Sequence, residues 1–135
     1  MKFNDFIKRK EVRKTELDIS LFNSLIETAE LDLKFLERTK IDEYSARKIM
    51  SNYYDILRSL LEAITLKEGY KVYSHEAFTF YLKEKGESEI SLKFDRFRRK
   101  RNKINYYGES VSVDEVKEYS EEIKRIIKEL KEKYL

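Results

Sequence analysis

The residues best suited to chemistry lie in one basic segment, FDRFRRKRNKINYYG, at positions 94–108. Arg101 follows Phe97 by four residues and precedes Ile104 by three, so on a helix its guanidinium is directed toward the apolar side. Burying a guanidinium without a partner is costly. Arg101 therefore either pairs internally or extends its charge to the surface, or it faces an anion site in a cleft. The pattern leaves both interpretations open.

Other side chains of types that can bind phosphate lie close to this arginine in the sequence. Arg98 and Asn105 fall at the rim of the apolar arc, while Asn102 and Tyr106 share an adjoining stripe with Asp95. Six cations occupy the eight positions 96–103 and cover most of the helix circumference, so some must point toward the protein body, a partner or a ligand. They are Arg96, Arg98, Arg99, Lys100, Arg101 and Lys103. Such a block predicts a phosphate footprint, which the net charge of +3 alone does not.

Two further candidates lie outside this segment. His75, the single histidine, stands at the first position of an expected helix and either faces solvent or opens onto the site. Asp55 lies near the middle of a long helix, on a polar stripe with Asn52, Ser59 and Glu62. It is either a solvated acid or the natural acidic partner of an inward arginine.

The composition restricts the class of protein. A chain of 135 residues is expected to form a single domain, 1–135. With no cysteine and one histidine, neither a disulfide nor a metal site is expected, and we expect no cofactor. No apolar run of about 18 residues and no signal-peptide pattern is present, so we expect no membrane association and, by default, a cytoplasmic location.

Apolar residues recur at helical spacing through most of the chain, which predicts an all-α, antiparallel up-and-down bundle of about five helices. We expect no sheet, and residues 1–14 form either an arm or a short helix. The expected helices span 15–38, 43–68, 75–85, 87–107 and 113 onward. Ile19, Leu31 and Phe35 lie outside the main apolar stripe of the first long helix, which hints at contact with another copy.

Capping signals support these boundaries. Gly69, Gly86 and Gly108 are expected to end helices. Asp42 and Ser74 are candidate N-caps. The segment 112–115, Ser-Val-Asp-Glu, reads as a capping box that opens the last helix.

At this level the chain resembles the HEPN superfamily, small helical domains found in prokaryotic toxin systems and in several RNA-cleaving enzymes. The helix over 46–64 with its Tyr53-Tyr54 pair resembles the second HEPN helix, and the segment 69–75, Gly-Tyr-Lys-Val-Tyr-Ser-His, resembles the opening of the third. The segment 101–106, Arg-Asn-Lys-Ile-Asn-Tyr, matches the family's R-N-x-x-x-H motif in spacing. Tyr106 stands where the motif has histidine.

The resemblance implies metal-independent RNA cleavage at a site that two protomers share. A base would remove the 2′-OH proton, and the oxygen would attack the adjacent phosphate. Arg101 would stabilise the charged transition state, and Asn102 would orient either the phosphate or the arginine. A tyrosine, with an ordinary pKa of about 10, is suited to donate a hydrogen bond or act as an acid. Arg98, Arg99, Asn105 and His75 would bind phosphate, with Asp55 as a supporting acid.

Two functions are therefore expected. The first is a HEPN-like homodimer that binds RNA or nucleotide phosphates, with ribonuclease or toxin-type activity through a degenerate site. The second is a helical dimer without catalysis that docks a protein partner. The resemblance suggests a minimal nucleotidyltransferase, as in a toxin–antitoxin pair, for that partner.

Overall fold

The computed structural model describes all 135 residues and contains six helices and two short strands. The expected all-α bundle is confirmed. In chain order the elements are α1 (Phe3–Lys8), β1 (Val12–Lys14), α2 (Ile19–Glu37), α3 (Ala46–Lys67), β2 (Tyr70–Val72), α4 (His75–Glu84), α5 (Ser88–Tyr107) and α6 (Val113–Tyr134).

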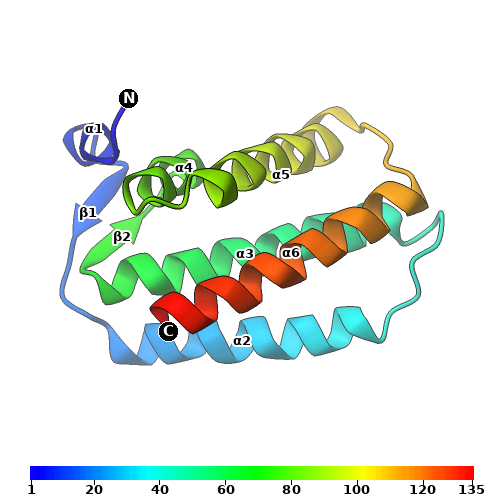
Figure 1. Cartoon of the computed structure of the whole chain (residues 1–135), viewed down its shortest axis with the longest axis horizontal. Helices are drawn as coiled ribbons and strands as arrows, with labels where there is room; N and C mark the ends of the chain where they lie inside the picture. The colour runs from blue at the N-terminus through cyan, green and yellow to red at the C-terminus, as the bar shows by residue number, and fades with distance from the viewer.

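The four long helices α2, α3, α5 and α6 form an up-down-up-down bundle, and α4 is the short additional helix (Figure 1). α3 lies at the centre and packs against α2, α5, α6 and β2. Its residues are therefore buried on nearly every side, including Tyr54, Leu57 and Leu61, which are fully buried. The apolar periodicity of α3 agrees with this position, because 14 of its residues are buried, more than in any other helix. No helix combines the length and apolarity that a bilayer crossing requires.

The helix ends agree with the capping signals in part. Ser112 Oγ accepts a hydrogen bond from the Glu115 N–H at 3.1 Å, and Glu115 Oε1 accepts one from the Ser112 N–H at 3.3 Å, so the capping box is confirmed. Gly108, with φ of 65°, ends α5 in the left-handed conformation. Ser74 makes no capping hydrogen bond with its side chain. Asp42 caps the turn before α3 instead of the helix itself, which begins four residues later.

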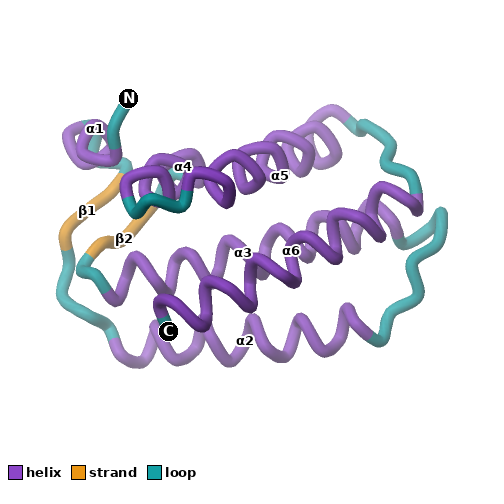
Figure 2. The backbone as a smooth tube through the Cα atoms, viewed as in Figure 1, coloured by secondary structure: helices purple, strands orange, loops and turns teal.

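The expectation that the chain has no sheet is wrong in one small region. β1 and β2 pair antiparallel, with Val12 opposite Val72, at the end of the bundle where α3 stops (Figure 2). Residues 1–14 form a short helix followed by this strand, and Phe3 and Phe6 are buried beside the rings of Tyr81 and Phe80. The N-terminal segment therefore packs against α4 and is not a free arm.

Candidate functional site

Arg101 occupies the inward position that its spacing predicts. Phe97 and Ile104, one turn away on either side, are fully buried, and the Arg101 side chain is only 18% exposed. Its guanidinium carbon lies 5.7 Å from the centre of the Tyr54 ring, within the range of a cation–π contact. Its Nη2 lies 3.6 Å from Asp55 Oδ1. Its Nε is buried and has no hydrogen-bond partner.

Asp55 is therefore the acidic neighbour of Arg101 rather than an isolated solvated acid. The pair is loose, because strong charge-assisted hydrogen bonds are about 2.7–2.9 Å long. Partial burial raises the pKa of the Asp55 carboxyl, although Arg101 and Arg58 oppose the rise. The Asp55 side chain is itself 41% exposed, and its contact of 3.6 Å leaves Arg101 incompletely paired.

His75 is drawn inward rather than facing solvent. It is the first residue of α4, and its Nδ1 lies 3.1 Å from the Tyr54 hydroxyl. Burial lowers the pKa of His75 to about 4, and the positive charges of Arg58, Arg101 and Arg98 add to the effect. The imidazole is therefore neutral at pH 7. A neutral ring in a positive environment can donate a hydrogen bond to an anion without adding charge.

Three arginines from two helices act on His75 through their positive charge, Arg58 from α3 and Arg101 and Arg98 from α5. Each has a carboxylate neighbour. Arg58 Nη1 lies 3.2 Å from Glu62 Oε2, and Arg98 Nη2 lies 2.8 Å from Asp95 Oδ1. Arg101 has the longest of the three contacts. We call Arg58, Arg98, Arg101 and His75 the arginine–histidine cluster.

The rest of the basic block is largely neutralised within the chain, so the phosphate footprint is smaller than the sequence predicts. Of the six cations, only Lys103 takes part in no ion pair. Asp95 on α5 lies between Arg98 and Arg99, and the remaining acids come from α6 and the loop before it. The shortest contacts join Arg96 to Glu122 (2.9 Å), Arg99 to Asp95 (2.9 Å), and Lys100 to Glu109 (3.1 Å) and Glu115 (3.4 Å).

The two asparagines and Tyr106 lie outside the cluster. Asn105 Oδ1 accepts a hydrogen bond from Ser51 Oγ at 3.0 Å, which joins the last turn of α5 to α3. Asn102 is half-buried, Tyr106 is 73% exposed, and neither makes a hydrogen bond with its side chain. Five residues on a helix turn through about 140°, so Tyr106 points away from Arg101. The structure does not bring the three expected catalytic residues together within one chain.

The sequence interpretation missed two members of this region. Tyr54 supports both His75 and Arg101, but it was assigned only to a resemblance. Arg58 follows Tyr54 by four residues and Asp55 by three, so it belongs to the polar side of α3 that faces α5. That helical spacing could have identified it.

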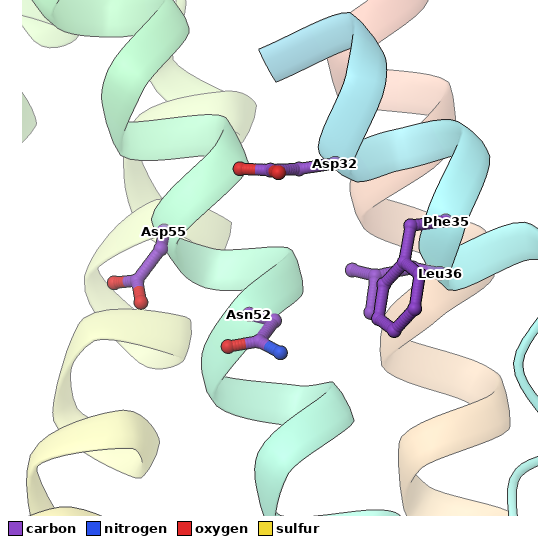
Figure 3. Close-up of a pocket in the computed structure, with 5 residues that line it drawn as sticks. All are labelled: Asp32, Phe35, Leu36, Asn52 and Asp55. Atoms are coloured by element: carbon purple, nitrogen blue, oxygen red, sulfur yellow. The ribbon is translucent and has the colours of Figure 1, made fainter. Parts of the chain in front are cut away.

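A separate pocket of about 260 Å³ lies between α2 and α3 (Figure 3). Asp32, Phe35 and Leu36 line it from α2, and Asn52 and Asp55 line it from α3. Figure 3 shows Asp55 on the side of α3 away from Phe35, so this residue lies at the border between the pocket and Arg101. With two carboxylates in its lining, the pocket repels phosphate.

The arrangement as a whole can bind an anion through Arg101. Burial holds the pKa of His75 at about 4, well below 7, and Tyr106 faces solvent on the other side of α5. Comparison with known proteins finds no matching family model, no similar curated protein and no similar solved structure.

Proposed function

We propose that this chain binds the phosphate groups of RNA or of nucleotides at the arginine–histidine cluster. The observation that carries the proposal is the incomplete pairing of Arg101, whose Nε is buried without a partner and whose nearest carboxylate oxygen is 3.6 Å away. A phosphate has oxygens enough to accept from Nε and Nη2 together, which a carboxylate at that distance does not do.

The surroundings of Arg101 favour an anion. A phosphate that reaches Arg101 replaces Asp55, whose contact with the guanidinium is long, at 3.6 Å. Neutral His75 can donate a hydrogen bond, and a nearby negative charge raises its pKa from about 4. The first turn of α4 begins at His75 with no side-chain cap from Ser74, so its N–H groups favour the same charge.

The proposal includes RNA cleavage of the HEPN type only at a site that two copies of the chain form together. Tyr106 points away from Arg101 of its own chain, so a second copy would have to place its Tyr106 near the cluster. The attacking 2′-OH would then lose its proton to water, Arg101 would stabilise the transition-state charge, and Tyr106 would donate a proton to the leaving 5′ oxygen.

Measuring RNA affinity of Arg101→Ala tests the proposal. A labelled oligoribonucleotide is titrated at about 50 mM salt, where phosphate contacts contribute most. We expect a loss of about tenfold or more, because hydrogen bonds between charged groups are the strong ones. Arg125→Ala, which removes an exposed arginine of α6, is the matched control. Folded Arg101→Ala protein that binds RNA as the wild type does would contradict the proposal.

A second candidate, docking of another protein copy or partner, is favoured by one face of α2. Leu21, Ser24, Thr28, Leu31 and Phe35 follow one another on α2 at alternating steps of three and four residues and carry no charge. Leu31 is 68% exposed and Phe35 is 65% exposed. Such spacing is typical of a seam that receives a second helix. A homodimer, or a helical partner such as a nucleotidyltransferase, would cover it.

A further inference from the structure

The outward side of α5 carries a second set of residues with the chemistry of nucleic-acid binding. Arg99, Asn102, Lys103 and Tyr106 stand at positions i, i+3, i+4 and i+7, so they share one face of the helix. We call these four residues the outer α5 face. The Tyr106 ring is 73% exposed and the Arg99 side chain is 70% exposed.

The polar groups of this face are free to bind a ligand. Lys103 is exposed and takes part in no ion pair, unlike the other five cations of the block. The side chains of Asn102 and Tyr106 make no hydrogen bond within the chain. Only Arg99 has a carboxylate neighbour, Asp95 at 2.9 Å.

We infer that the outer α5 face binds single-stranded RNA by stacking a base on the Tyr106 ring. Lys103 and Arg99 contact the flanking phosphates, and the Asn102 amide hydrogen-bonds the edge of a base. This inference deepens the proposed function, on which it rests, by specifying the form of the nucleic acid and assigning Tyr106 to stacking.

The single-stranded form follows from the chemistry of the face. An exposed aromatic ring can stack only on a base whose own face is free, which a duplex does not offer along its length. A duplex would be bound through many phosphates at once. This face has one unpaired cation, Lys103, and the exposed Arg99 beside one ring, which suits a short, flexible strand.

Stacking and proton transfer would use different parts of the Tyr106 side chain. Stacking needs the ring and not the hydroxyl, so Tyr106→Phe should retain the affinity of the wild type within about twofold. Tyr106→Ala should lose about tenfold, within the range of one base–aromatic stack. Because the ring is exposed, neither substitution disturbs the core.

The test is fluorescence anisotropy of labelled oligouridylate with these two variants and Lys103→Ala. A duplex of the same length is the second probe. Tyr73→Ala and Lys128→Ala are the controls. Tyr73 is 56% exposed and follows β2, which lies at the opposite end of the bundle from the end of α5 (Figure 1). Lys128 is an exposed, unpaired lysine of α6.

The inference predicts that Tyr106→Ala and Lys103→Ala weaken binding of the single strand, that the controls do not, and that the duplex binds at least tenfold more weakly. Equal binding by Tyr106→Ala and wild type, or by duplex and single strand, would overturn it. If Arg101→Ala loses affinity while Tyr106→Ala does not, the proposed function stands and only this inference fails. If the wild type binds no RNA at low salt, both fail.

Discussion

Lowering the pH from 7 to 5 should destabilise the protein through His75. Burial holds the pKa of this imidazole at about 4 in the folded state, against an ordinary value of 6.5. Between these values the unfolded chain binds a proton that the folded chain does not. Stability contributed by the neutral ring is therefore present at pH 7 and is lost as the pH falls from about 6.5 toward 4.

The size of the effect follows from the two pKa values. The linkage relation assigns His75 a loss of about 2 kcal/mol between pH 7 and pH 5, approaching about 3 kcal/mol near pH 4. In a domain of this size a loss of about 2 kcal/mol lowers the Tm by roughly 6 °C. The groups that set the effect are Arg58, Arg98 and Arg101, with Glu62 opposing them.

Urea denaturation followed by circular dichroism at pH 7 and pH 5 measures this loss. His75→Asn is the matched control, because an amide can retain a hydrogen bond to the Tyr54 hydroxyl but does not titrate. Acids whose pKa the fold lowers, such as Glu87 and Glu115, also lose stability at low pH, and they do so equally in both proteins. Equal losses in the wild type and in His75→Asn would refute the assignment of a buried, neutral histidine.

Three further outcomes are expected. Arg101→Ala should lower stability by about 1–2 kcal/mol in urea denaturation, since it removes a cation–π contact and a partly exposed ion pair; a loss of about 3–5 kcal/mol would instead indicate a buried structural pair. The wild type should be a dimer at tens of micromolar in light scattering, and Leu31→Lys with Phe35→Lys should be a monomer, whereas Leu92→Lys, on an exposed residue of α5, should not change the mass. Tyr106→His should create or raise metal-free cleavage of single-stranded RNA if the two-chain form exists, and binding without cleavage would leave a binding module.

The sequence was sufficient to predict the helices, because their apolar residues recur at regular spacing. Helices of three turns or more carry many apolar residues at fixed spacing, so their existence and order could be predicted. The inward direction of Arg101 followed from Phe97 and Ile104 in the same way. The small sheet could not be predicted, because β1 has three residues and buries only Val12.

The ion pairs and protonation states of the site residues were harder to predict, because they depend on contacts between different elements of the fold. The acids that neutralise Arg96 and Lys100 lie 9 to 26 residues further along the chain, on α6 and in the loop before it. His75 is neutral because burial disfavours its charged form and the charges of Arg58, Arg101 and Arg98 add to the effect. The resemblance to the HEPN motif implied one shared site for Arg101 and Tyr106, whereas helix geometry directs them to different sides.

We expect phosphate to compete with Asp55 for Arg101. Calorimetric titration of pyrophosphate into Asp55→Asn measures this competition. Removing the carboxylate charge frees the guanidinium with little change of shape. We expect Asp55→Asn to bind pyrophosphate about threefold to tenfold more tightly than the wild type, and Arg101→Ala to bind it least. Unchanged or weaker binding by folded Asp55→Asn protein would contradict the claim.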